Sequence, residues 1–339
     1  MEVFRKWRVF WARVRSMSFR RMGMYARQIG KETGRARPLI LLDMLWCAAR
    51  YRIGYLDYRV FGFCGKPARV RKTYMTMEHN LALSRRMNDP AAVRVFQDKA
   101  LFNQRFADFL GRGWIDLRQA GEAGLRAFCA GKDAVFAKQT ESFGGQGIVR
   151  VPLVPPPDFA ALYSRLTGEK QWLVEEAIRQ HPEMDRLCES SINTVRIVTL
   201  WPPGGEPQMV YALVRMGNGR GCVDNISSGG LYTQVSGAGV LTAPAFCDKT
   251  GEYYERHPAT GTVIPGFRIP CFEQAVALCQ KAARVEPRVR YVGWDVAITP
   301  EGPVLVEGNE LPGYDMCQNA GQVECGILPR FREILGKAD

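Results

Sequence analysis

Histidine is scarce in this sequence of 339 residues and occurs only at positions 79, 181 and 257. The ten cysteines contain no C-x-x-C pair, and no group of cysteine and histidine has the spacing of a zinc site. Free thiols in a reducing cytoplasm fit this pattern best. The sequence also lacks a Cys/His or Ser/His/Asp constellation, so a covalent enzyme intermediate is not predicted.

Long hydrophobic runs are absent as well. A membrane-spanning helix needs about 20 consecutive apolar residues. The most apolar run, residues 38–49, is shorter and contains Asp43. Arginines interrupt the aromatic N-terminal segment, so this segment does not have the uninterrupted apolar core of a signal peptide. The expected location is therefore the cytoplasm.

Positive charge is concentrated at the N-terminus. The net charge is +12, and residues 1–37 contain eleven Lys and Arg side chains against two Glu. The rest of the chain is nearly neutral. A general nucleic-acid-binding surface is therefore not predicted, and the basicity belongs to an N-terminal arm.

The arm, residues 1–35, has the pattern of a basic amphipathic helix. Its apolar stripe consists of Val3, Trp7, Phe10, Val14 and Met17. Such a helix binds the anionic inner surface of a membrane, or packs on the protein's own body, or on a second subunit of a homodimer. The sequence leaves these three alternatives open.

The pattern along the chain indicates the α+β class. Residues 1–95 have a mostly helical pattern, and strands become frequent from about residue 130. The expected strands are 135–138, 148–151, 172–175, 194–200, 208–215, 291–298 and 304–307. Helices are expected at 157–167, 272–285 and 327–335. We predict a helical region at 1–95, one α+β lobe at 96–175 and a second lobe at 176–339.

Two expected strands near the C-terminus form a hairpin around a Pro-Glu-Gly turn. Glu307 and Asn309 are two residues apart, so they point to the same face of one strand, and Asp295 lies on the other strand. Two carboxylates and an amide make a hard-oxygen site of the kind that Mg²⁺ prefers. The alternative is an exposed strand face with scattered acids.

A second feature is a short apolar strand that ends in Lys138, followed by the glycine-rich run 142–148. Glycines let the backbone approach a ligand closely and direct N–H groups at phosphate oxygens. The run is neither G-x-x-x-x-G-K-[ST] nor a G-x-G-x-x-G that opens a helix. We expect a glycine-rich turn between two strands that covers a phosphate, although such hairpins are also common without a ligand.

A third feature is the apolar strand that runs into Glu175, Glu176 and Ile178. Backbone groups just past such a strand can pair with the edge of an adenine ring, while Ile178 packs on its face. Glu183 can accept hydrogen bonds from ribose hydroxyls. The alternative is a strand end with solvent-facing acids.

The order of these features resembles the ATP-grasp superfamily over about residues 95–320. Lys99 comes first, then Lys138 before the glycine-rich loop, then the acidic strand end and finally the hairpin. Three further runs, 181–184, 191–199 and 223–230, resemble the sugar-transfer-associated ATP-grasp family. Superfamily members often carry a Rossmann-like domain before the grasp, whereas residues 1–95 have a helical, basic pattern.

The resemblance implies a fold of two α+β lobes with ATP between them, and it implies site residues. The resemblance implies that Lys99 and Lys138 bind the phosphates of ATP. The loop residues Ser142, Gly144, Gly145 and Gly147 would fold over these phosphates. Glu175, Glu176 and Ile178 would bind adenine, and Glu183 would bind ribose. Binding of one or two Mg²⁺ ions falls to Asp295, Glu307 and Asn309.

The resemblance also implies an ATP-dependent ligase that joins a carboxylate to an amine or thiol through an acyl phosphate and releases ADP. The substrates would be an amino acid or peptide and a sugar, glycan or peptide acceptor. Two alternatives use the same fold: phosphoryl transfer to a hydroxyl, as in a kinase, and non-catalytic ATP binding in envelope polysaccharide assembly.

Two arginines and one loop are the remaining candidates. Arg196 and Arg215 lie on expected strands, and we predict that one binds the γ-phosphate and the other binds the substrate carboxylate or oxyanion. Surface ion pairs are the alternative for both. The polar loop 224–230 suits a polar substrate, which Asn225, Ser228 and Gly229 would bind, although a plain surface loop has the same composition.

Overall fold

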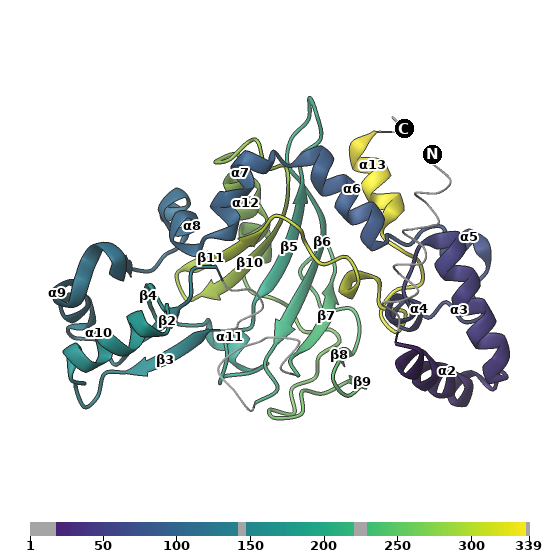
Figure 1. Ribbon diagram of the computed structural model, residues 1–339, viewed down its shortest axis with the longest axis horizontal. Coiled ribbons are helices and arrows are strands. Elements are labelled where there is room, and N and C mark those ends of the chain that lie inside the picture. The colour runs from purple at the N-terminus through teal and green to yellow at the C-terminus, as the bar shows by residue number, and fades with distance from the viewer. Residues whose placement is uncertain (1–17, 142–146, 220–228, 337–339) are drawn as a thin grey trace.

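The computed structural model describes residues 18–141, 147–219 and 229–336. Its α+β architecture confirms the predicted class. A small sheet with two helices forms one end of the molecule, a large sheet forms the middle, and the N-terminal helices form the other end (Figure 1). Among the described residues, none of the helices is long and apolar enough to cross a bilayer.

The first part of the chain is helical, as expected. Its helices are α2 (Phe19–Thr33), α3 (Arg37–Tyr51), α4 (Tyr55–Val60), α5 (Ala68–Arg71), α6 (Met77–Met87), α7 (Pro90–Gln97) and α8 (Lys99–Arg105), followed by the 3₁₀ turn η1 (Ala107–Phe109). Local chemistry sets their ends. Ser18 caps the first turn of α2 through a hydrogen bond from the Arg21 N–H, and Gly34 ends the helix in the left-handed conformation.

The small sheet has the strand order β1-β4-β2-β3 and is antiparallel throughout. Its strands are β1 (Trp114–Asp116), β2 (Ala134–Lys138), β3 (Ile148–Pro152) and β4 (Leu173–Glu176). The helices α9 (Leu117–Cys129) and α10 (Phe159–Gly168) cover one face. Apolar residues of both helices form a core there with alternate strand residues such as Val135, Ala137 and Val174.

The large sheet has the order β11-β10-β5-β6-β7-β8-β9, and every neighbouring pair is antiparallel. Its strands are β5 (Val195–Leu200), β6 (Gln208–Met216), β7 (Leu231–Val235), β8 (Ala245–Cys247), β9 (Glu252–Tyr254), β10 (Tyr291–Thr299) and β11 (Gly302–Asn309). The helical elements of this part are α11 (Pro182–Asp185), α12 (Phe272–Ala283), η3 (Met316–Gln318) and α13 (Leu328–Leu335).

All seven expected strands are present, with ends shifted by no more than two residues. The strands β1, β7, β8 and β9 were not expected. Three of them have only three residues each, which is too short for a recognisable alternation of apolar and polar residues. The residues of β7 are all buried, so this strand also has no alternation.

The two faces of the large sheet contribute to two different cores because side chains alternate along a strand. On one face, residues such as Ile197 and Trp294 pack with α12, α7 and α8. On the other face, residues such as Val198 and Tyr291 pack with the N-terminal helices and α13. The helical region and the large sheet therefore share a core. The expected division at residues 95/96 and 175/176 stays a prediction.

One buried side chain joins the helical region to the sheet. The Asn88 side-chain amide donates to the carbonyl oxygens of Tyr291 at 2.9 Å and Glu310 at 2.8 Å. Its oxygen accepts from the N–H groups of Arg290 and Tyr291, both at 2.9 Å. Asn88, which follows α6, thereby forms hydrogen bonds with four backbone groups of Arg290, Tyr291 and Glu310.

We expect Asn88→Ala to lower the free energy of unfolding by about 2–4 kcal/mol, since buried backbone groups would lose their partners. Urea unfolding measures the change. Gln97→Ala is the control, because its side chain makes one exposed hydrogen bond, to Glu310. If both variants lower the free energy of unfolding by the same small amount, Asn88 does not join the helical region to the sheet.

Candidate active site

The two hairpin carboxylates face each other across β10 and β11. Asp295 lies directly opposite Glu307, and Gly293 lies opposite Asn309. Residues directly opposite each other in an antiparallel pair share a face, so Asp295, Glu307 and Asn309 lie on the same side of the sheet. The Asn309 side-chain amide donates to the Gly293 carbonyl oxygen at 3.4 Å. The structure therefore brings together the three predicted metal ligands.

Both predicted catalytic arginines bind Asp295. Arg196 is opposite Asp295 on β5 and contacts its carboxylate with Nε and with Nη2, the latter at 2.9 Å. Arg215 donates from Nη2 at 2.8 Å and also contacts the Thr194 hydroxyl. Burial alone would raise the pKa of Asp295, but the two guanidinium groups outweigh it and hold the pKa below its ordinary value.

This arrangement differs from the expected one, in which the two arginines reach a γ-phosphate and a substrate carboxylate. Register explains the difference, because Arg196 and Asp295 are cross-strand partners. Arg196 is buried, and Nε and Nη2 of its guanidinium group are committed to Asp295. The catalytic assignment of Arg196 and Arg215 stays a prediction.

Glu307 has the opposite titration behaviour. Removal of its carboxyl group from water raises its pKa, and the neighbouring Asp295 raises it further, whereas Arg215 and Lys99 oppose the shift. Two adjacent carboxylates are costly to ionise together without a cation between them.

The donors are hard oxygens of the kind that Mg²⁺ prefers, and a divalent cation would offset the charge of Glu307. The Asp295 oxygens also accept from Arg196 and Arg215, so Asp295 would share its carboxylate between the arginines and the metal ion. Among residues 18–141, 147–219 and 229–336, no three or more His, Cys, Asp and Glu side chains form a metal-binding group. The protein ligands would thus be two carboxylates and the amide oxygen of Asn309.

A second charged group lies on the small sheet, around Glu175. The Glu175 carboxylate is buried, forms an ion pair with Lys138, and accepts hydrogen bonds from Asn103 at 2.6 Å and Arg112 at 2.9 Å. Burial opposes ionisation, but these cations and hydrogen bonds outweigh it and lower the pKa of Glu175. The expected contact of this carboxylate with adenine is not supported, since its oxygens already hold Lys138, Arg112 and Asn103.

Lys99 connects the two groups electrostatically. Its main-chain N–H donates to the Thr140 carbonyl oxygen at 3.0 Å, which holds the start of α8 beside the end of β2. Burial lowers the pKa of Lys99, and nearby Lys138 lowers it further, while Glu307 and Glu175 oppose the shift. The two predicted phosphate-binding lysines therefore interact with each other, and Lys99 also interacts with Glu307 of the hairpin.

Arg112 lies beside the candidate site and is absent from the residues that the sequence predicted for it. It is almost completely buried. Besides Glu175 on the small sheet, it contacts the carbonyl oxygens of Leu305 at 2.7 Å and Val306 at 3.2 Å on β11 of the large sheet. One guanidinium group thus ties the two sheets together next to Glu307.

The two glycines around Arg112 explain how it fits. Gly111 has φ +57°, and a Cβ there would lie 2.4 Å from the nearest Val304 side-chain carbon. A Cβ on Gly113 would lie 3.0 Å from the carboxylate of Glu176. The run Gly-Arg-Gly before a strand is the signal that sequence reasoning had available.

The remaining predicted nucleotide-binding residues form no hydrogen bond or ion pair with Glu175, Lys138 or Arg112 in the described part of the chain. The Glu176 carboxylate accepts from the Gly113 N–H at 2.8 Å and pairs with Lys132 at 3.4 Å, while Ile178 is half-buried in the segment between the sheets. Glu183 is exposed and pairs with Arg186 at 2.8 Å. Both of these residues line an open cavity of about 680 Å³, whose lining, among the described residues, contains none of the other predicted nucleotide-binding residues. The ribose contact of Glu183 stays a prediction.

Several predicted residues lie outside the described ranges, namely Ser142, Gly144, Gly145, Asn225 and Ser228, as does the apolar stripe of residues 1–17. Gly147 is described and has φ +69°, and its carbonyl oxygen accepts from the Gln171 side chain at 3.3 Å. Gly229 has φ +97°, and its carbonyl oxygen accepts from the Asn218 side chain at 3.1 Å. Their ligand contacts stay predictions.

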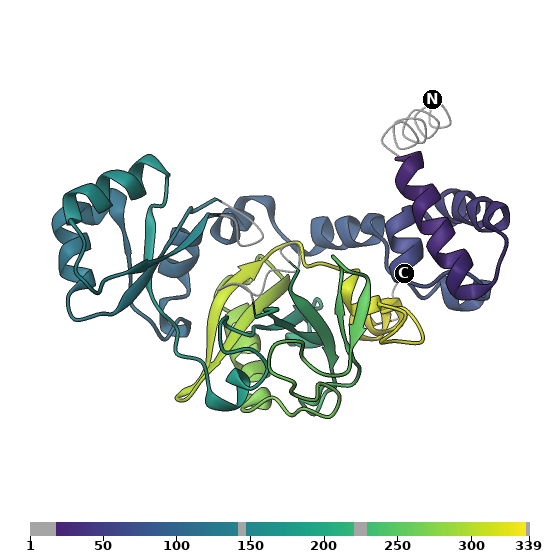
Figure 2. The same cartoon turned by 90° about the horizontal axis from the view of Figure 1, so that it is seen from below.

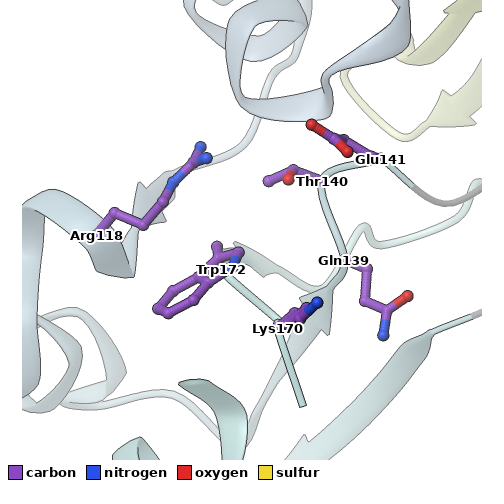
Figure 3. Close-up of a pocket in the computed structure, with 6 residues that line it drawn as sticks. All are labelled: Arg118, Gln139, Thr140, Glu141, Lys170 and Trp172. Atoms are coloured by element: carbon purple, nitrogen blue, oxygen red, sulfur yellow. The ribbon is translucent and has the colours of Figure 1, made fainter. Parts of the chain in front are cut away.

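A cavity of about 310 Å³ lies beside the residues that precede the glycine-rich loop. Gln139, Thr140 and Glu141 come from the end of β2, and the other lining residues are Arg118, Lys170 and Trp172 (Figure 3). The cavity is polar and carries both signs of charge.

Comparison with known proteins gave one family. The family model described as sugar-transfer associated ATP-grasp matches residues 159–334, which is more than half of the chain. The search of the curated proteins found no match.

Among solved structures, the chain is similar to the D-alanine-D-alanine ligase from Coxiella burnetii at 12% identity, with a TM-score of 0.42 and coverage of 72% of this chain and 58% of that one. The ATP-grasp ligase PsnB, solved with minimal precursor, Mg and ADP, is similar at 12% identity, with a TM-score of 0.43 and coverage of 74% and 61%. The chain thus spans less than two thirds of the length of either ligase.

We expect Arg112→Lys to weaken Mg-ATP binding about tenfold, because a lysine cannot hold a carboxylate and two carbonyl groups in the planar geometry of a guanidinium. Titration calorimetry measures the affinity. Arg126→Lys is the matched control, since Arg126 is exposed on α9 and pairs with Glu122 four residues away. Equal affinities for both variants would show that the link between the sheets does not support the site.

Proposed function

The chain belongs to the sugar-transfer associated ATP-grasp family, and we propose that it is an ADP-forming ligase that joins a carboxylate to an amine or a thiol through an acyl phosphate. The proposed substrates are an amino acid or peptide and a sugar, glycan or peptide acceptor. ATP is the proposed phosphoryl donor, and Mg²⁺ is the proposed metal ion.

One observation carries this proposal: a lysine of α8 interacts with charged residues of both sheets. Lys99 and Lys138 lie within electrostatic reach of each other and of Glu175, and Lys99 is also within reach of Glu307. A carboxylate substrate and a γ-phosphate repel each other, so their reaction needs fixed cations around both groups. The two lysines supply positive charge, and Asp295, Glu307 and Asn309 would hold the metal.

The proposed chemistry has two steps. An oxygen of the substrate carboxylate forms a bond to the γ-phosphorus while the bond from this phosphorus to the bridging oxygen breaks, which releases ADP. The amine or thiol then attacks the acyl carbon, inorganic phosphate leaves, and the nucleophile loses its proton. Bound Mg²⁺ would neutralise phosphate charge during the first step.

The two arginines receive different roles in this proposal. Arg196 is a positioning residue, because it holds Asp295 with two nitrogens and its side chain is 8% exposed. Arg215 contacts Asp295 with one nitrogen, and its side chain is 16% exposed. We propose that Arg215 stabilises the developing phosphate charge.

The test is release of ADP and phosphate with Mg²⁺ and ATP, across pools of amino acids, sugar acids and amines. Glu307→Gln removes a proposed metal ligand, and we expect it to lower acid- and amine-dependent turnover about 100-fold or more, since several kcal/mol of charge stabilisation would be lost. Asp295→Asn is expected to act in the same direction. Glu301→Gln is the matched control, because Glu301 is exposed at the turn of the same hairpin.

The products distinguish the alternatives. A ligase releases ADP and phosphate only when both the acid and the nucleophile are present. A kinase releases ADP without free phosphate and needs no amine, so that result would replace the ligase by hydroxyl phosphorylation. Binding of Mg-ATP without turnover in any pool would support a non-catalytic component instead.

A further inference from the structure

The outward face of α3 is apolar between Leu39 and Trp46. Leu39 and Leu42 are each 63% exposed, Trp46 is 60% exposed and Leu45 is 45% exposed. Positions 39, 42 and 46 are three or four residues apart, which places them on one stripe of a helix. We call these four residues the α3 stripe. Single exposed apolar residues are normal on a protein surface, but a continuous stripe indicates an interaction site.

The opposite face holds α3 in place. Ile40, Met44 and Cys47 are buried in the core that the helical region shares with the large sheet. Asp43 accepts two hydrogen bonds from Arg71, both at 2.7 Å, and one from the Tyr58 hydroxyl at 2.6 Å. The helix therefore cannot rotate to bury the stripe without losing these contacts.

The stripe lies at the outer end of the molecule. Figures 1 and 2 show α2 and α3 at the end opposite the small sheet, so a partner on this end leaves the candidate active site accessible. Neighbouring elements of the same region add exposed apolar side chains, namely Phe19 and Met24 on α2 and Leu56 on α4.

The charge around the stripe has one sign. Residues 18–75 contain thirteen Lys and Arg side chains against three Asp and Glu. Arg37 and Arg50 are exposed at the two ends of α3, and Arg52 is exposed just beyond it. Asp43, the one acid within α3, is already paired with Arg71.

We propose that the α3 stripe docks the protein on a lipid bilayer with anionic headgroups. The 15 residues of α3 extend about 22 Å at 1.5 Å per residue, which is shorter than a bilayer core, so the helix lies in the plane of the interface. Its apolar stripe enters the boundary between headgroups and acyl chains. Arg37 and Arg50 contact the anionic headgroups from its ends.

Charge decides between a bilayer and a second copy of this chain. Two copies placed stripe to stripe would bring two strongly basic regions together, and like charges across an interface oppose association. An anionic surface complements the same charges. This inference moves the expected membrane contact from residues 1–35 to α3, although the basic, aromatic residues 1–17 precede α2 directly in the sequence.

Co-sedimentation of the full-length protein with vesicles tests the proposal. One vesicle set contains phosphatidylglycerol and phosphatidylcholine, and the other contains phosphatidylcholine alone. We expect binding to the anionic set, and we expect the double variant Leu42→Gln/Trp46→Gln to weaken it at least about tenfold because it removes large apolar side chains from the interface. Val263→Gln is the control, since Val263 is 46% exposed but lies between β9 and α12, outside the helical region.

A second pair of variants tests the charges. Arg37→Gln and Arg50→Gln are each expected to weaken binding to the anionic vesicles about fivefold, and added salt should weaken the wild type in the same direction. Arg126→Gln and Arg165→Gln are the controls, because these exposed arginines lie on α9 and α10, the helices that cover the small sheet. Melting curves establish that all variants are folded.

Three results would overturn the proposal. The first is no binding of the wild type to anionic vesicles. The second is undiminished binding of Leu42→Gln/Trp46→Gln, including the case in which only deletion of residues 1–17 abolishes it. The third is a wild-type dimer in sedimentation velocity that the stripe variant converts to a monomer, since a second copy would then occupy the stripe.

Discussion

The position of Asp295 on β10, between β11 and β5, is the constraint on which the candidate site depends. Strand pairing places Arg196 on one side of Asp295 and Glu307 on the other. The arginines keep Asp295 ionised although it is buried, while Glu307 is left beside an existing negative charge. The Glu307 carboxyl group is therefore the costly one to ionise, and a divalent cation beside it would offset that cost.

A second interaction relates the two sheets. The Glu175 carboxylate organises Lys138, Arg112 and Asn103 on the small sheet, and Arg112 extends from there to the backbone of β11. The phosphate-binding candidates and the metal-binding candidates are thus held together by one arginine and one glutamate. Because Arg112 contacts backbone carbonyl groups next to Glu307, a shift between the sheets would change the geometry of the hairpin carboxylates.

The helical region contributes in a different way. Its inner side completes the core on one face of the large sheet, and Asn88 joins it to the start of β10. Its outer side carries an apolar stripe, and residues 18–75 have a net charge of +10, against +12 for the whole chain. The same helices therefore stabilise the sheet that holds the candidate site and offer, on the far end, the surface for which we propose a bilayer contact.

The sequence alone determined the α+β class, the helical N-terminal part, the hairpin and the shared face of Asp295, Glu307 and Asn309, because alternation of residues and turn chemistry are local properties. It also predicted Lys99 and Lys138 as phosphate-binding residues through a family resemblance. What the sequence could not determine is which charges are already neutralised within the protein. The sequence predicted Arg196 and Arg215 as ligand-binding cations, but both form ion pairs with Asp295.

Tertiary structure decided those pairings because they join residues that are far apart in the chain. Glu175 is 63 residues from Arg112, and Arg196 is 99 residues from Asp295. No local pattern specifies such a contact, since it depends on the order of strands in a sheet and on how two sheets meet. Similarly, the apolar residues of α3 predict a buried helix by composition, and only the packing of Ile40, Met44 and Cys47 reveals which side of the helix remains exposed.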